Sequence, residues 1–259
     1  MAKIEQQRDH FDNISAKYFS ARKDPNHLLL KRYIWEYFFS RNTFPAKRYR
    51  VLEPMCGYGE GKYILEQYGH LDIDYSGFDY SQSLIDLVKK EDPDSPIYQQ
   101  DVTRFMADAA ADRYDLIILI GGLHHVYEHA GDVIRNLAAA LAVGGHFITL
   151  EPTQNFTLFK LIRSRIYERN SLFDEQTEQA FDLAELNGLF ASSGLTLLDQ
   201  IYPGLLSYVL YYNPDAFPVL NHGGKLGVRA TFGIDKWFMA NTVGRKLSFA
   251  TLSHYMRLR

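Results

Sequence analysis

The sequence has little of what disulfide-stapled, zinc-clustered or membrane-spanning proteins need. It contains one cysteine in 259 residues, Cys56, which excludes an intramolecular disulfide and a cysteine-rich zinc site. No uncharged apolar run reaches about 18 residues, so an ordinary membrane-spanning helix is not expected. The N-terminus is charged from the start and has no apolar signal core. We therefore expect a cytoplasmic protein.

Strong charge and low complexity are also absent. The formal net charge is −3, with 46% hydrophobic and 23% charged residues, as in an ordinary globular protein. We find no internal repeat and no RNA-binding motif, and an acidic chain is a poor candidate for a nucleic-acid partner. The average hides an asymmetry, because residues 220–259 carry seven Lys and Arg but one acid. A basic, aromatic C-terminal segment therefore follows an acidic main part.

Short apolar runs alternate with stretches of helical periodicity from residue 50 onward. This alternation is typical of parallel βαβ units whose sheet is covered on both faces. Strands are expected at 50–54, 74–79, 96–101, 115–120 and 146–151, with helices at 60–69, 81–91 and 131–142. Two more strands are expected at 195–202 and 204–212. Further helices are expected at 11–19, 27–39, 156–169 and 178–193, with Asp24 at the break before the second of these.

Two glycines and three acids stand where strands of this sheet end. Gly57 and Gly59 follow the first strand and precede a helix, which lets the backbone approach a ligand closely. Glu53, Asp79 and Asp101 close the first three strands, and the carboxyl ends of parallel strands line one crevice. An acid after the second strand can accept hydrogen bonds from ribose hydroxyls, and a polar group after the third can reach an adenine amino group.

A dinucleotide-binding dehydrogenase would also need such glycines and an acid about 20 residues on. Asp79 lies 22 residues after Gly57, so this spacing does not separate the two families. The loop reads Gly57-x-Gly59-x-Gly61, however, and the dehydrogenase fingerprint reads Gly-x-Gly-x-x-Gly. The loop therefore disfavours a dehydrogenase.

Five motifs in order resemble those of the class I S-adenosylmethionine-dependent methyltransferases, over residues 45–152. The first joins Glu53 to the glycine loop, with Met55 where the family usually has a glycine. The second is Gly77 to Ser81, the third Gln100 to Val102, the fourth residues 114–125, and the fifth residues 141–148. Small-molecule, quinone and natural-product methyltransferases are the nearest group.

The resemblance implies an α/β, Rossmann-like, doubly wound sheet of seven mostly parallel strands with an antiparallel last strand. It also implies S-adenosyl-L-methionine as cofactor and S-adenosyl-L-homocysteine as product. Asp79 would bind the ribose, Asp101 would lie near the adenine, and Tyr18 would come from a helix that folds over the cofactor. The full set of cofactor-binding residues expected is Tyr18, Glu53, Met55, Gly57, Gly59, Asp79, Tyr80, Asp101, Val102, Gly121 and Gly122.

On this pattern the chain is one domain, 1–259, with five parts. Residues 46–152 form the cofactor-binding core and 181–212 its end, while 1–45 form an N-terminal helical lid. A helical lid insertion occupies 153–180, and the basic aromatic extension occupies 213–259. Arg22 and Arg32 of the N-terminal part are candidates to face the carboxylate of the cofactor.

His124 and His125, just past the fourth strand, are the candidate catalytic residues. Histidine titrates near neutrality and can take a proton as a bond to the acceptor forms. The alternative is that this turn only packs the junction between strand and helix. His125, Glu128 and His129 also suggest a metal site, but the ligand set is incomplete and no metal is expected. Cys56 is expected to be a buried, space-filling thiol.

The acceptor is expected to be a small molecule, apolar with an anionic group, because the segment 156–169 is basic and apolar. Oxygen is the preferred acceptor atom, followed by carbon or nitrogen, and a lipid-linked intermediate is an alternative acceptor. The tail from Gly244 has three candidate positions: on an anionic membrane, against the lid, or against the second subunit of a homodimer. A non-catalytic, cofactor-binding partner protein is the alternative from a different class.

Overall fold

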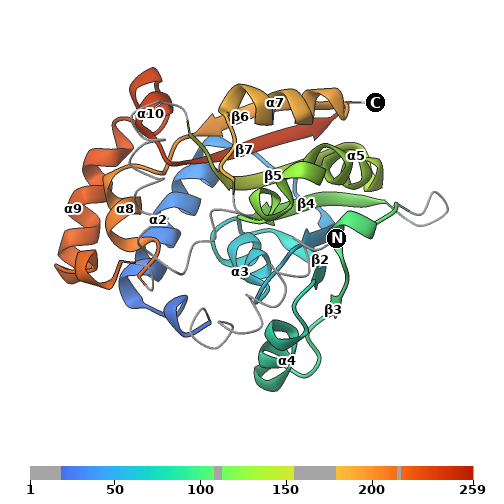
Figure 1. Ribbon diagram of the computed structural model, residues 1–259, viewed down its shortest axis with the longest axis horizontal. Helices are drawn as coiled ribbons and strands as arrows, with labels where there is room; N and C mark the ends of the chain where they lie inside the picture. Colours follow the sequence, from blue (N-terminus) through green and yellow to red (C-terminus); the bar gives the residue numbers. More distant parts are fainter. Residues whose placement is uncertain (1–18, 108–112, 155–178, 215–216, 259) are drawn as a thin grey trace.

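The apolar runs expected as strands form one seven-stranded sheet in the computed structural model, which describes residues 19–107, 113–154, 179–214 and 217–258 (Figure 1). The strand order is β3-β2-β1-β4-β5-β7-β6. Neighbours among β1 to β5 are parallel, and β7 is antiparallel to both β5 and β6, so the expected fold class is confirmed. The strands are β1 (Arg48–Pro54), β2 (Asp72–Asp79), β3 (Ile97–Gln99), β4 (Tyr114–Ile120), β5 (Leu141–Pro152), β6 (Leu195–Ile201) and β7 (Ala250–Arg257).

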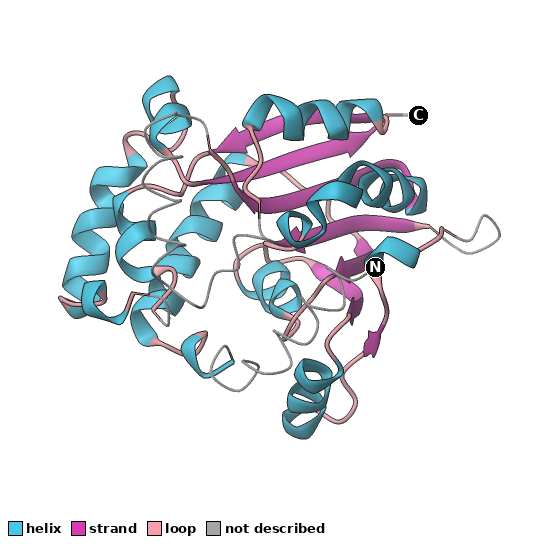
Figure 2. Ribbon diagram, in the orientation of Figure 1, coloured by secondary structure: helices cyan, strands magenta, loops and turns pink. Residues whose placement is uncertain are grey.

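Helices cover both faces of the sheet, as Figure 2 shows. Alternate residues of a strand point to opposite faces, so β4 sends Leu116 and Ile118 into one core and Ile117 and Leu119 into the other. The first core packs against α2 (Pro25–Arg41), α3 (Glu60–Gln67) and α4 (Gln82–Glu91). The second packs against α5 (Ala130–Ala140) and α7 (Leu183–Ser192). This is the doubly wound arrangement.

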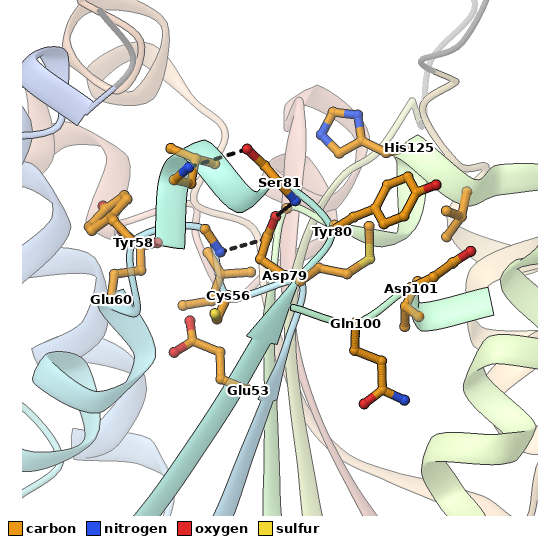
Figure 3. A pocket seen from close by; sticks show the side chains of 18 residues that line it. Glu53, Cys56, Tyr58, Glu60, Asp79, Tyr80, Ser81, Gln100, Asp101 and His125 are labelled. Carbon is orange, nitrogen blue, oxygen red and sulfur yellow. Dashed lines mark hydrogen bonds between the residues drawn. The ribbon is translucent and has the colours of Figure 1, made fainter. Parts of the chain in front are cut away.

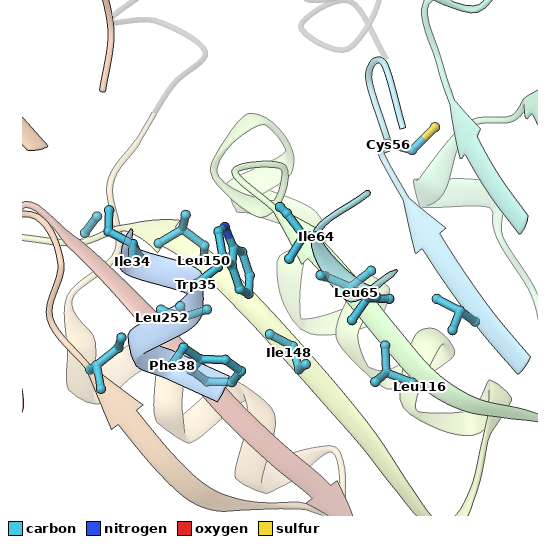
Figure 4. Packing of buried hydrophobic residues seen from close by; sticks show 14 of the residues in the cluster. Ile34, Trp35, Phe38, Cys56, Ile64, Leu65, Leu116, Ile148, Leu150 and Leu252 are labelled. Atoms are coloured by element: carbon cyan, nitrogen blue, oxygen red, sulfur yellow. The ribbon is translucent and has the colours of Figure 1, made fainter. Parts of the chain in front are cut away.

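Helix α2 shows why the N-terminal segment belongs to the core. Its N-cap is Asp24, whose Oδ1 accepts the backbone N–H of Asn26 and of His27, as the sequence predicted. Trp35 and Phe38 are fully buried and lie over β5 and β7 (Figure 4). The helix expected at 11–19 lies almost wholly outside the described residues, and the one expected at 156–169 lies outside them entirely.

The strand predicted at 204–212 is wrong, because this segment contains the helix α8 (Leu206–Tyr211). Its aromatic and branched side chains favour a strand by local propensity. The buried carboxylate of Asp235 overrides this preference by accepting the backbone N–H groups of Leu206 and Ser207 and the Ser207 hydroxyl. The capping acid lies 28 and 29 residues along the chain from the two residues it caps, where local reasoning cannot find it.

The last strand of the sheet is β7, which lies in the segment expected to be a C-terminal extension. The sequence of this segment lacks the apolar pattern of a buried strand, because Thr251, Ser253 and His254 are polar. All three are nevertheless buried. Each is paired across the sheet, with Thr153, Gln200 and His146 respectively. The core of the fold therefore does not end at residue 212, because β7 joins β5 to β6.

The connection from β6 to β7 carries α8, the short helix η3 (Pro218–Leu220), α9 (Gly224–Lys236) and α10 (Thr242–Leu247). Since β6 runs parallel to β5, this connection leaves from the edge at which β5 also ends. Within the described ranges, no helix is both long and apolar enough to cross a membrane.

Candidate functional site

A pocket lies at the carboxyl ends of β1, β2 and β4, on the edge where the acids were expected to meet (Figure 3). In this view Tyr58 and Glu60 lie on one side, and Asp101 and His125 on the other. The residues that line it are Glu53, Met55, Cys56, Gly57, Tyr58, Glu60, Asp79, Tyr80, Ser81, Leu84, Gln100, Asp101, Val102, Ile120, Gly121, Gly122, His125 and Val126.

The glycine loop is held by Asp79. Asp79 Oδ2 accepts the Gly57 N–H at 2.8 Å, and Oδ1 accepts the Ser81 N–H at 2.9 Å. Gly57 has φ +54° and Gly59 has φ +76°. Residues that carry a Cβ disfavour this left-handed conformation. A carboxylate offers about four acceptor sites, two of which these bonds use. Asp79 thus fixes the loop and presents its carboxylate to the pocket.

Glu53 is a buried clamp for the start of α3. Both carboxylate oxygens accept the Gly61 N–H at 3.0 Å, and the Tyr75 hydroxyl donates to Oε2. A Cβ on Gly61 would lie 2.7 Å from the Glu53 carboxyl carbon, so this position has room only for glycine. Burial raises the pKa of Glu53 to about 8.

Met55 stands where the family usually has a glycine, and it adopts the left-handed conformation that glycine favours, with φ +54°. A Cβ on Gly122 would lie 2.9 Å from Met55 Sδ and 3.0 Å from its Cβ. Gly122 therefore provides the space that the Met55 side chain occupies. The left-handed conformation costs a residue with a Cβ about 1–2 kcal/mol.

Asp101 begins the short helix η1 (Val102–Arg104). Its Oδ1 accepts the Thr103 N–H at 2.9 Å and the Thr103 hydroxyl at 2.7 Å. Leu84, Val102 and Val126 also line the pocket, which therefore combines this acid with apolar side chains.

A buried ion pair between α2 and α3 borders the pocket, and sequence patterns do not predict it because its partners are 29 residues apart in the chain. Lys31, with its side chain 4% exposed, donates to Glu60 and, at 2.7 Å, to the Tyr58 hydroxyl. Burial lowers the pKa of Lys31, with Glu60 opposing the shift. Burial pushes the pKa of Glu60 upward, but Lys31 outweighs it and the pKa is lowered. The pocket therefore has a charged wall supplied partly by α2.

The two candidate histidines occupy different places. They lie in the irregular 3-10 segment η2 (Leu123–His129), with ring centroids 3.9 Å apart. His125 lines the pocket, whereas His124 Nδ1 is hydrogen-bonded to the buried Glu151 Oε2 at 3.0 Å. Glu151 also accepts the backbone N–H groups of Gly122 and Leu123, at 3.0 and 2.9 Å. Burial raises its pKa to about 8.

The metal interpretation of residues 125–129 gains no support. Among the residues that the structure describes, no group of three His, Cys, Asp or Glu could hold an ion. The segment is also kinked, with Val126 at non-helical angles, so positions 125 and 129 do not share a regular helix face. Cys56 is buried, and burial raises its thiol pKa well above the usual value, unlike that of an activated nucleophile.

Most of the residues predicted to bind cofactor line the pocket, but two of the named site residues that the structure describes do not. Gly59 is instead the N-cap of α3, His124 faces Glu151, and Tyr18 lies outside the described residues. Arg32 pairs with Glu36 on the exposed side of α2, and Arg22 donates to the Tyr212 carbonyl oxygen. The residues that line the pocket as predicted are Glu53, Met55, Gly57, Asp79, Tyr80, Asp101, Val102, Gly121, Gly122 and His125.

The donor set fits S-adenosylmethionine. A carboxylate at the end of β2 suits a pair of ribose hydroxyls, and glycine backbone at the end of β1 lets the cofactor lie close to the loop. The Asp101 carboxylate and the apolar side chains around η1 suit adenine, a flat base with polar atoms along its edge. The ionic wall of Lys31 and Glu60 suits the charged amino-acid end.

Comparisons with known proteins agree with this site. The family model of the methyltransferase domain matches residues 12–200. A Haloferax volcanii methyltransferase, in complex with the Trm112 methyltransferase activator, has a similar structure at 15% identity and TM-score 0.62, with 97% of each chain covered. The 4+2 cyclase SpnF is similar at 14% identity and TM-score 0.60, over 97% of this chain and 95% of its own.

An O-methyltransferase from a trans-AT PKS multienzyme of Brevibacillus brevis, in complex with S-adenosyl-L-homocysteine, is similar at 17% identity and TM-score 0.55. The match covers 87% of this chain and 71% of that chain. A search of curated protein sequences finds no match. Because the family model spans well over half of the sequence, the chain belongs to the methyltransferase-domain family, as an S-adenosylmethionine-dependent methyltransferase of the class I fold.

Proposed function

We propose that the protein transfers a methyl group to the oxygen of a small-molecule acceptor, with His125 as general base. S-adenosylmethionine supplies an activated methyl group, so the chain's own task is to align the acceptor and handle its proton. Asp79 would bind the ribose, Asp101 and Val102 would hold the base, and Lys31 and Glu60 would face the amino-acid end. The Brevibacillus brevis O-methyltransferase of similar fold is in keeping with an oxygen acceptor.

The observation that carries the proposal is the position of His125. Its ring lines the pocket, and the neighbouring His124 ring lies against it with Glu151 behind. Glu151 also ties down the backbone of Gly122 and Leu123, which fixes where the histidines project. In this arrangement His125 accepts a hydroxyl proton as the oxygen–methyl bond forms, while His124 and Glu151 are positioning residues.

The test is a screen for S-adenosyl-L-homocysteine release against hydroxyl, amine and enol acceptors, followed by kinetics of His125→Gln on the best substrate. We expect kcat to fall roughly 100-fold or more, the usual contribution of a general base. The Kd of S-adenosyl-L-homocysteine should change little. The exposed His222→Gln is the matched control and should leave kcat unchanged.

The same variant separates the alternative acceptor atoms. An enol carbon or an amine needs less help from a base than a neutral hydroxyl does. Unchanged turnover in His125→Gln would therefore contradict the oxygen proposal and favour carbon or nitrogen. We further propose a cytoplasmic homodimer acting on an apolar acceptor with an anionic group, on the sequence grounds given above.

A further inference from the structure

The outermost helix of the molecule exposes apolar side chains to solvent. Helix α9 packs against α2 and α8 and lies at the outer edge of the view in Figure 1, with α10 next to it. Leu226 is 81% exposed and Trp237, directly after the helix, is 80% exposed. Exposed apolar side chains that gather on one surface mark an interaction site, whereas single ones do not.

These exposed side chains share one side of α9. At about 3.6 residues per turn, Leu226, Ala230, Ile234 and Trp237 follow one another along a single stripe. The opposite side carries Val228 and Asp235, which are 0% and 2% exposed. Because the Asp235 carboxylate accepts two N–H groups at the start of α8, the helix cannot rotate to bury the stripe.

Helix α10 also exposes apolar side chains. Val243 and Leu247 lie one turn apart and are 47% and 42% exposed. A Cβ on Gly244 would lie 1.9 Å from the Phe238 carbonyl oxygen, so α10 packs directly on the chain that leaves α9. The two helices are therefore held in contact. We call their exposed apolar side chains, with the basic residues of the same helices, the α9–α10 surface: Leu226, Ile234, Trp237, Val243 and Leu247.

Those basic residues give the surface one sign of charge. Asp235 is the only acid in residues 218–257, and it is buried. On α2 and α8, the helices that pack against α9, the one acid is Glu36, which is paired with Arg32 at 2.7 Å. The exposed basic side chains are Lys225, Arg229, Lys236, Arg245 and Lys246.

We propose that the α9–α10 surface binds the face of an anionic lipid membrane. Apolar side chains that enter the headgroup region, a tryptophan at the interface, and flanking lysine and arginine are the features that interfacial helices use. The positive charge complements anionic headgroups. The contact is peripheral and leaves β7 in the sheet, so it involves residues 225–247 rather than the whole basic tail.

The position of the α9–α10 surface relative to the pocket affects which molecules a bound membrane would bring close. The connection that holds α9 and α10 leaves the sheet at the carboxyl edge, where the pocket also lies. A membrane bound at this surface would bring lipid-borne molecules near the same end of the enzyme. The binding itself does not depend on the proposed function, and it is measured without turnover.

The experiment is co-sedimentation of the full chain with vesicles of phosphatidylcholine, and of phosphatidylcholine mixed with phosphatidylglycerol. We expect binding to the anionic vesicles only, with an affinity that falls as salt rises. Lys225→Gln with Arg229→Gln and Lys246→Gln should weaken binding roughly 100-fold, since each cation contributes roughly fivefold at an anionic surface. Leu226→Ser with Trp237→Ser should also weaken it, at least about tenfold.

Point variants are used because deleting residues 244–259 would remove β7. All substituted side chains are exposed, and circular dichroism should show an unchanged fold; Val143→Ser, 68% exposed elsewhere, is the matched control and should bind as the wild type does. Equal binding to both vesicle types, or full binding by both multiple variants, would overturn the proposal. A dimer that dissociates in Leu226→Ser with Trp237→Ser, without vesicle binding by the wild type, would assign the surface to a second copy instead.

Discussion

Glu53 and Glu151 both close strands at the pocket edge, yet both carboxyl groups bind backbone N–H groups of the chain itself. Their burial raises each pKa to about 8. Glu53 therefore holds the start of α3, and Glu151 holds the turn that follows β4. Asp79, Asp101 and His125 also line the pocket but are only partly buried. Strand-end position predicted where these residues would gather. It could not predict which carboxylates are fully buried and which stay partly open to the pocket, because that depends on how the rest of the chain packs over them.

Another residue-scale feature is a buried pair of neutral histidines between β5 and β7. His254 Nδ1 donates to Asn42 Oδ1 at 2.7 Å, because an amide oxygen can only accept. His254 Nε2 must then accept from His146 Nδ1, at 2.9 Å. A proton added to His254 Nε2 would set two N–H groups against each other and break this contact. Burial, together with His146, lowers the pKa of His254 to about 3.

This pair predicts a loss of stability in acid. The unfolded histidine has a pKa near 6.5, so the stabilisation is complete above that pH and is lost as pH falls from about 6.5 toward 3. Between about pH 7.5 and pH 5, the wild type should lose about 2 kcal/mol more unfolding free energy than His254→Gln, measured by urea denaturation. The exposed His222→Gln should follow the wild type. The same pH profile for wild type and His254→Gln would contradict this account.

At the scale of elements, periodicity predicted the strands and helices of residues 48–152 because each buries a local, regular apolar pattern. The same reasoning was wrong at α8 and did not find β7. In both places, buried polar contacts between distant segments decide the structure: Asp235 with Ser207, and Thr153 with Thr251. Polar pairs leave no apolar period in the sequence, so only the folded chain reveals them.

The junction between β6 and β7 yields an element-scale prediction. A Cβ on Gly204 would lie 2.1 Å from the Ala250 nitrogen and 2.6 Å from the Phe249 nitrogen, where rigid backbone cannot yield. Gly204→Ala should therefore lower the unfolding free energy by about 3 kcal/mol. Gly188→Ala in α7 is the control, since no atom lies within 4 Å of its Cβ. Alanine there should be neutral or stabilising by up to about 1 kcal/mol. Equal effects of the two substitutions, seen by thermal denaturation, would contradict the packing described.

At the scale of the whole molecule, the acidic and the basic parts of the sequence occupy different parts of the structure. The acidic main part builds the sheet and pocket, and the basic residues of the C-terminal segment gather around α9 and α10 while β7 completes the sheet. Sequence motifs predicted the family and fold, because each motif is a local strand end or turn. They did not predict the wall formed by Lys31 and Glu60, because it depends on how α2 packs over the loop.

The central claim is that the pocket at the carboxyl edge binds the methyl donor through Asp79. Calorimetric titration of S-adenosyl-L-homocysteine tests it most directly, on the wild type, Asp79→Ala and Asp72→Ala. The two aspartates begin and end the same strand, but only Asp79 lines the pocket. We predict that Asp79→Ala raises the Kd at least about tenfold, as expected for lost hydrogen bonds to a charged group, and that Asp72→Ala does not. Equal Kd values for wild type and Asp79→Ala, or no binding to the wild type, would contradict the account.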